Sequence, residues 1–313
     1  MGGAGGKGFR PGRKESIESR ESKVSLKDFA STPADFSWYA CLKTMIPRIL
    51  RGRDLEDLSE RIATARREER PLIVMMGAHV VKCGLGGLLG TLLRRGIITR
   101  VAINGACAIH DVEIAMWGKT SEDVGEGLKS GLFGETEETA RFFAAATRVA
   151  FTDKIGLGKS LGQALRERSA PNSAASILAT AAETGVPVTV HVALGTDVVH
   201  QHSEADGAAI GYSTMEDFRD FASAIAGLRG GVVLNLGSAV ILPEVFLKAL
   251  AMACNAGADL GQFTTANFDM IPLYRPTMDV VERPRLVGAT TYNFTGNHEI
   301  LLPVFFASIM SRL

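Results

Sequence analysis

Five of the six histidines in this chain follow short apolar segments, at positions rich in glycine and other small residues. They are His79, His110, His200, His202 and His298, whereas the sixth, His191, lies within an apolar segment. Imidazole changes its protonation state near neutral pH, and it is also a common metal ligand. The residue types therefore predict a shared site that performs acid–base chemistry or binds a metal.

For acid–base chemistry, the candidate proton-transfer groups are His110, His200, His202 and His298. Asp269 and Asp197 are candidates to orient these rings through hydrogen bonds, and we count Asp269 among the catalytic residues. Lys82 is the one lysine near a predicted strand end, so it can supply an amine for imine chemistry. A phosphate contact or an extended surface side chain is the commoner role for such a lysine.

A metal site is the alternative. Asp197, His200 and His202 form the pattern D-x-x-H-x-H, and carboxylate with neutral imidazole suits zinc or iron. The more specific zinc motif HExxH is missing, and so is the GxSxG turn of serine hydrolases. The glycines of KCGLGGLLG do not have the spacing of the dinucleotide fingerprint, so we interpret them as helix-packing positions.

The elements that position these residues alternate along the chain. Short apolar segments predict strands within 71–84, 101–111, 186–197, 230–240, 262–269 and 285–294. Helical periodicity is found over 35–67, 85–95, 113–128, 135–149, 173–184, 216–228, 242–255 and from 297 onward. This alternation predicts an α/β fold, a doubly wound parallel sheet with helices on both faces. Ligands of such sheets bind at the carboxyl ends of the strands, where the histidines are expected.

Composition narrows the class of protein. The chain has 313 residues, with 34 basic and 34 acidic side chains, so its net charge is zero. This balance argues against binding to nucleic acid or to an anionic membrane, which requires excess positive charge. The four cysteines form no CxxC pair and are expected as reduced thiols in a cytoplasmic protein. Residues 1–24 are predicted to be a disordered arm. Residues 25–313 are predicted to form one domain, in which 25–70 is a helical N-terminal extension.

Four segments, in this order and spacing, resemble the deoxyhypusine synthase family from Pro71 to the C-terminus. They are GLGGLLGTLLRRGIITRVAINGA, PVTVHVALGTD, VVLNLGSAVILPEVFLKALAMACNAGADLGQFTTANFD and TGNHEILLPVFFASIM. The resemblance implies a Rossmann-like fold and a homotetramer with NAD at subunit interfaces. It also implies oxidation of spermidine by NAD, followed by aminobutyl transfer through a lysine imine to a lysine of a translation factor.

The resemblance also implies where NAD would bind. The cofactor-binding positions of the family correspond to Ala78, His79, Asn104, Gly105, His110, Asp197, Gly237, Ser238, Thr265, Ala266 and Asn297. Thr265, Ala266, Gly237 and Asp197 keep the residue type of the family, whereas His79, His110 and Asn297 do not.

The residues for the family's reaction are largely replaced. The stretch that carries the family's catalytic lysine is Glu282-Arg283-Pro284-Arg285-Leu286 here, and arginine stays protonated and forms no imine. Pro243 stands where the family has a substrate-binding histidine. The acidic segment that binds polyamine is reduced to Asp269 followed by Met-Ile-Pro. We therefore do not expect this chain to make deoxyhypusine.

Three hypotheses remain from the sequence. The first is an NAD-dependent enzyme of oxidoreductase or transferase type that acts on a small amine or alcohol. The second is a metal-dependent hydrolase or lyase, and the third is a non-catalytic nucleotide-binding protein. The apolar helices before Pro71 and the tail LLPVFFASIM fit either the protein core or a subunit interface. The tetramer that the resemblance implies favours an interface, so a homo-oligomer is expected, either a tetramer or a dimer.

Overall fold

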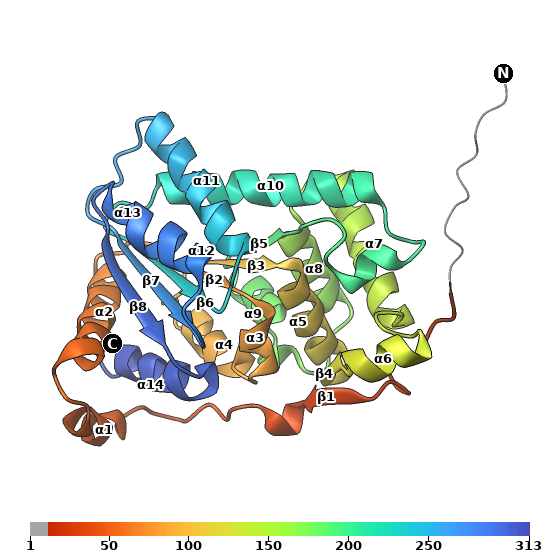
Figure 1. Cartoon of the computed structure of the whole chain (residues 1–313), viewed down its shortest axis with the longest axis horizontal. Helices are drawn as coiled ribbons and strands as arrows, with labels where there is room; N and C mark the ends of the chain where they lie inside the picture. Colours follow the sequence, from red (N-terminus) through yellow and green to blue (C-terminus); the bar gives the residue numbers. More distant parts are fainter. Residues whose placement is uncertain (1–11) are drawn as a thin grey trace.

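The computed structural model describes residues 12–313 of the chain. Six strands form one parallel sheet with the order β5-β3-β2-β6-β7-β8 (Figure 1). The strands are β2 Leu72–Met76, β3 Arg100–Asn104, β5 Val188–His191, β6 Val232–Leu236, β7 Thr264–Asp269 and β8 Thr290–Thr295. The predicted doubly wound α/β fold is confirmed.

Helices cover both faces of the sheet because side chains of each strand alternate between the faces. Val74 and Met76 of β2 point to a core shared with α2 (Leu50–Arg67), α4 (Gly86–Arg94), α5 (Gly105–Trp117), α9 (Ile177–Thr184) and α14 (His298–Met310). Ile73 and Met75 point to the other core, formed with α10 (Gly207–Ala226) and α11 (Ile241–Asn255). Figure 1 shows α10 and α11 above the sheet and α2 and α14 below it.

The remaining helices connect these layers. They are α1 Tyr39–Met45, α3 Ala78–Lys82, α6 Val124–Ser130, α7 Glu137–Asp153, α8 Leu157–Glu167, α12 Tyr274–Pro276 and α13 Arg283–Arg285, with a π-helical turn, η4, over Thr277–Glu282. The sixth strand therefore starts at Thr290 and not near 285. Arg283–Arg285 is helical and a turn leads from it to the strand, and Arg285 pairs with Glu282 three positions earlier.

The sheet reverses its direction of growth between β2 and β6. The chain adds β3 and then β5 on one side of β2, returns to the centre, and adds β6, β7 and β8 on the other side. In sheets of this kind the crevice at such a switch point is the usual ligand site. Helices that follow β2, β3, β6 and β8 begin at this same carboxyl edge.

The N-terminal segment differs from the prediction. Ser22–Ser25 forms strand β1, which pairs antiparallel with β4 (Lys119–Glu122), and Ile17 and Arg20 are buried. Disorder over 1–24 is therefore wrong for residues 12–24, while residues 1–11 lie outside the described residues. The helix predicted over 113–128 is also interrupted, because Gly118 ends α5 in a left-handed conformation with φ of 68° and β4 follows.

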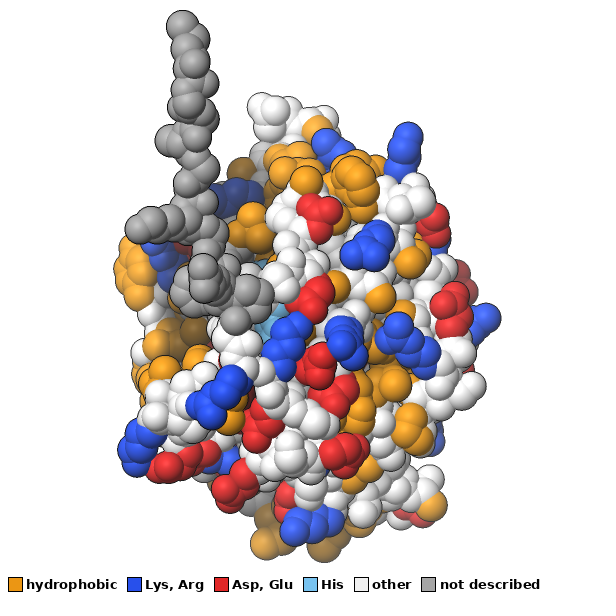
Figure 2. Space-filling model, turned by 90° about the vertical axis from the view of Figure 1, so that its right-hand side faces the viewer, with side chains coloured by type: hydrophobic (Ala, Val, Ile, Leu, Met, Phe, Trp, Pro, Cys, Tyr) orange, Lys and Arg blue, Asp and Glu red, His pale blue; other side chains and the backbone are white. Residues whose placement is uncertain are grey.

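The surface shows mixed charge. On the face in Figure 2, basic and acidic side chains are interspersed with exposed apolar ones. No helix within residues 12–313 is both long and apolar enough to span a membrane.

Candidate functional site at the carboxyl edge of the sheet

Most of the predicted site residues lie at the carboxyl edge. Ala78 and His79 begin α3, Asn104 and Gly105 join β3 to α5, and Asn297 precedes α14. Gly237 and Ser238 follow β6 directly, and Asp269 ends β7. Gly77 and Gly237 meet at the switch point, where a Cβ on Gly77 would lie 2.4 Å from the carbonyl oxygen of Gly237.

Thr265 and Ala266 are placed differently from the prediction. Both are fully buried near the amino end of β7, where Thr265 pairs in register with Val233 and donates its hydroxyl to the carbonyl of Val280. The strand continues to Asp269, so these residues lie several positions before its exit. Their prediction as cofactor-binding residues is wrong, because the segment taken as the exit loop is itself buried strand.

A cavity of about 300 Å³ lies beside the first turns of α5, and we call it the α5 cavity. Its walls include three predicted residues, Lys82, His110 and Asp197. Arg20 and Lys23 from the N-terminal segment also line it, which the sequence did not predict. A volume of this size is at the lower end of the range for small-molecule sites.

A chain of hydrogen bonds connects His110 to a buried ion pair. Nδ1 of His110 lies 2.6 Å from the hydroxyl oxygen of Thr120, and that hydroxyl donates to Glu113. Glu113 also accepts two hydrogen bonds, of 2.9 and 3.0 Å, from the guanidinium of Arg20. Because the only proton of the Thr120 hydroxyl goes to Glu113, its oxygen accepts from His110, and we assign the proton of His110 to Nδ1.

This assignment leaves the lone pair of Nε2 of His110 available as a base. Burial lowers the pKa of His110 to about 4, so the ring is neutral at physiological pH. Burial also raises the pKa of Asp197 in the same cavity to about 6. The arrangement can therefore accept a proton from a bound alcohol or amine.

Asp197 is held against the start of α5. A Cβ on Gly105 would lie 1.9 Å from a carboxylate oxygen of Asp197, so this close approach requires glycine. The prediction that Gly105 and Asp197 belong to one site is consistent with this contact.

His200 has little capacity to act as a base, because backbone groups use the lone pair of its Nδ1. Its Nδ1 accepts the backbone N–H groups of Gly195 and Asp197 at 3.2 and 3.3 Å, which places the proton on Nε2. That Nε2 lies 3.9 Å from Asp197. Nδ1 is thus committed to the backbone and the ring stabilises the loop that carries Asp197, whereas Nε2 is beyond hydrogen-bond distance of that carboxylate.

His202 faces another part of the chain. It is buried, and its Nε2 lies 2.8 Å from the carbonyl oxygen of Gly134, before α7. Within residues 12–313, the only group with converging metal-ligand atoms comprises His79, Cys83 and Glu299. The predicted metal set of Asp197, His200 and His202 is therefore wrong: its ligand atoms do not converge, and one ring nitrogen of each histidine lies against a backbone group.

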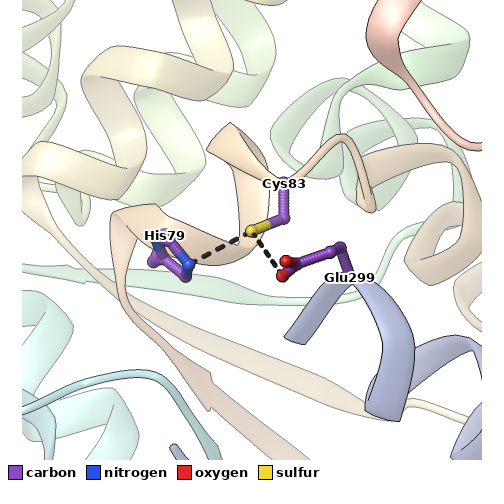
Figure 3. A group of neighbouring side chains, drawn as sticks. All are labelled: His79, Cys83 and Glu299. Carbon is purple, nitrogen blue, oxygen red and sulfur yellow. Dashed lines mark hydrogen bonds between the residues drawn. The ribbon is translucent and has the colours of Figure 1, made fainter. Parts of the chain in front are cut away.

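Figure 3 shows this second group, which we call the His79 cluster: His79, Cys83 and Glu299 point toward one another from α3 and α14. Burial and the nearby ring of His298 lower the pKa of His79. Burial and the carboxylate of Glu299 raise the pKa of the Cys83 thiol to about 11. A bare thiolate is thus disfavoured here.

His298 and Asp269 lie next to the His79 cluster. The rings of His298 and His79 are 5.3 Å apart, and Nε2 of His298 lies 3.2 Å from the carbonyl oxygen of Phe268. Nδ1 of His298 and Oδ2 of Asp269 are buried without a hydrogen-bond partner among the described residues. Burial raises the pKa of Asp269. Unpaired buried polar atoms are costly and often mark functional positions.

Five residues of these two groups were not predicted from the sequence: Arg20, Glu113, Thr120, Cys83 and Glu299. A signal existed for Cys83, because His79 and Cys83 are four residues apart and so share one face of a helix. Nothing comparable marked Arg20, whose role depends on the pairing of β1 with β4.

The fold is similar to that of solved enzymes. A putative deoxyhypusine synthase from Entamoeba histolytica has a TM-score of 0.50 and 10% identity, over 77% of this chain and 76% of that one. This chain has a deoxyhypusine synthase-like fold. Unliganded AgrE has a TM-score of 0.53 and 14% identity, over 83% of this chain and 32% of AgrE. The chain thus spans about a third of the length of AgrE. No protein-family model and no curated protein matches the sequence.

Proposed function

We propose that this chain is an NAD-dependent enzyme that oxidises a small amine or alcohol at the α5 cavity. The observation that carries the proposal is the cavity itself. It places a neutral histidine, a carboxyl group and a lysine together at the carboxyl edge of a doubly wound sheet.

The residues fit a phosphate-bearing cofactor. Arg20 is paired with Glu113 and Lys23 with Asp123, so Lys82 is the basic side chain of the cavity that forms no ion pair with a described residue. The N-terminus of α5, a helix of 13 residues, begins at the same edge and adds partial positive charge. When bound, NAD supplies a hydride acceptor.

His110 is the proposed base. Removal of hydride from a carbon bearing oxygen or nitrogen requires loss of the O–H or N–H proton, and Nε2 of His110 accepts it. The imidazolium that forms is stabilised through Thr120 by the carboxylate of Glu113. Asp197 binds the amine or hydroxyl of the substrate and orients it.

Deoxyhypusine formation is not part of this proposal. Arg283 and Arg285, in the stretch that corresponds to the family's catalytic lysine, pair with Asp279 and Glu282 in the helical segment before β8. Neither arginine lines the α5 cavity. Lys82 is the lysine that lines the cavity, but we assign it to phosphate binding and not to imine formation.

Calorimetric titration with NAD tests the proposal. We expect saturable one-to-one binding below about 1 mM NAD, weakened about tenfold in Lys82→Ala, which corresponds to about 1.4 kcal/mol. Lys159→Ala is the matched control, because Lys159 is also exposed but lies on α8, away from the cavity. No binding at millimolar NAD, or equal weakening by both variants, contradicts the proposal. NAD binding without reduction of NAD by any amine or alcohol favours the non-catalytic alternative.

A further inference from the structure

Three side chains from two distant parts of the sequence converge between α3 and α14. In the His79 cluster, Sγ of Cys83 lies 3.2 Å from Nε2 of His79 and 3.7 Å from Oε2 of Glu299 (Figure 3). The three possible ligand atoms all lie within 4.8 Å of one another. The cluster is outside the α5 cavity, although α3 contributes to both.

Local structure accounts for two members of the cluster. His79 lies in the first turn of α3 and Cys83 directly follows its last residue, Lys82; four residues apart, they lie on one face of this short helix. Gly84 follows with φ of 71°, a left-handed conformation that turns the chain away from the helix just after Cys83.

The third member depends on the packing of α14. This helix follows β8, which is three strands away from β2 in the sheet. To bring Glu299 to Cys83, the start of α14 crosses the exit of β6, where His298 occupies the space beside Gly237. A Cβ on Gly237 would lie 2.6 Å from Cε1 of His298, so the absence of a side chain at this position permits the approach.

The spacing matches a tetrahedral metal centre. Zinc bonds of about 2.3 Å to sulfur and about 2.0–2.2 Å to nitrogen or oxygen place neighbouring ligand atoms about 3.5 Å apart. The observed separations from Sγ, 3.2 and 3.7 Å, bracket that value. Thiolate and imidazole favour zinc over magnesium or calcium, which prefer oxygen ligands.

We propose that His79, Cys83 and Glu299 bind one zinc ion at the carboxyl edge of the sheet, with a fourth coordination position open. Two anionic ligands, the thiolate and the carboxylate, balance the charge of the ion. Three protein ligands and one open position are typical of zinc sites that polarise a carbonyl or activate water. This inference goes beyond the proposed function and does not depend on NAD binding.

Metal titration of the chelator-treated full chain tests the inference. With Zn²⁺ we expect one ion per chain by elemental analysis after removal of excess metal. With Co²⁺ as a spectroscopic probe we expect absorption from thiolate-to-cobalt charge transfer. Cys83→Ala is expected to weaken Zn²⁺ binding by about 100-fold or more and to abolish that absorption, and Glu299→Gln is expected to weaken binding by at least about tenfold.

Two controls keep the result interpretable. Cys254→Ala removes an exposed thiol on α11 and is expected to change neither measurement. Glu299 is exposed, so Glu299→Gln tests the site even if Cys83→Ala does not fold. Substoichiometric zinc, cobalt binding without thiolate absorption, or zinc retained by Cys83→Ala would overturn the inference. NAD titration of the metal-free protein separates failure of this site from failure of the α5 cavity.

Discussion

The α5 cavity and the His79 cluster lie at the same sheet edge and share α3, yet their polar groups are arranged differently. At the cavity, His110 is connected through Thr120 and Glu113 to Arg20, so the buried charges of Glu113 and Arg20 are paired with each other. The second nitrogen of the imidazole, Nε2, is left for proton transfer. At the cluster, three ligand atoms approach one another, and neighbouring atoms of His298 and Asp269 are unpaired.

The difference teaches how one edge can hold two kinds of site. A completed hydrogen-bond chain fixes a tautomer and prepares a group for proton transfer. Converging donors and acceptors without a central partner instead suit a cation. Proximity of a histidine to a strand end does not distinguish these roles, because His200 and His202 are also near such an end and bind backbone groups.

The largest effect is expected from a substitution that breaks the chain of hydrogen bonds at its buried end. Arg20→Ala leaves the carboxylate of Glu113 buried without its cation, because Glu113 is only 2% exposed. We expect a loss of about 3–5 kcal/mol in the free energy of unfolding, measured by chemical denaturation.

Lys23→Ala is the control for this change. Lys23 lies on the same segment but pairs with Asp123 at the surface, where such pairs contribute about 0–1 kcal/mol. Equal effects of the two substitutions would show that the N-terminal segment, and not the buried pair, supports the cavity.

A smaller effect is expected where Asp197 contacts α5. Gly105→Ala places a Cβ into the carboxylate, and we expect destabilisation of about 1–3 kcal/mol, measured by thermal unfolding. Adding Asp197→Ala is expected to recover at least half of the loss, because the clash is removed.

Gly211→Ala, in the second turn of α10 with open space around it, is the control and is expected to stabilise by about 0.5–1 kcal/mol. Absence of recovery in the double variant would mean that Gly105 is required for another reason.

The smallest expected effect concerns protonation. Because burial lowers the pKa of His110 to about 4 in the folded chain, the unfolded chain binds more protons between about pH 4 and 6.5. Stability therefore falls as pH is lowered through this window, by at most about 2 kcal/mol at pH 5 from this residue. Unfolding curves of His110→Gln should show a correspondingly weaker dependence on pH.

Nuclear magnetic resonance of ¹⁵N-labelled protein checks the same residue directly. We expect His110 to carry its proton on Nδ1 and to stay neutral down to about pH 4. Thr120→Val removes the acceptor of that proton and should shift the ring toward the other tautomer. An unchanged tautomer in Thr120→Val would contradict the hydrogen-bond chain.

The sequence by itself determined the parallel sheet, because apolar segments of strand length alternate with helical periodicity. It also placed most of the histidines near strand ends, since glycine and small polar residues mark where buried strands finish. The prediction for Thr265 and Ala266 was wrong. Small residues near the amino end of a buried strand look like an exit loop until the register of that strand with β6 is known.

Only the tertiary structure decided which of these residues meet. The contact of Arg20 with Glu113 spans 93 positions, and that of Cys83 with Glu299 spans 216. Such pairs leave no periodic signal, because they arise from the order of strands in the sheet and the crossing of α14 over Gly237. The direction of each imidazole nitrogen likewise depends on partners that folding brings together, and these partners decide whether a histidine supports a loop, transfers a proton or binds a metal.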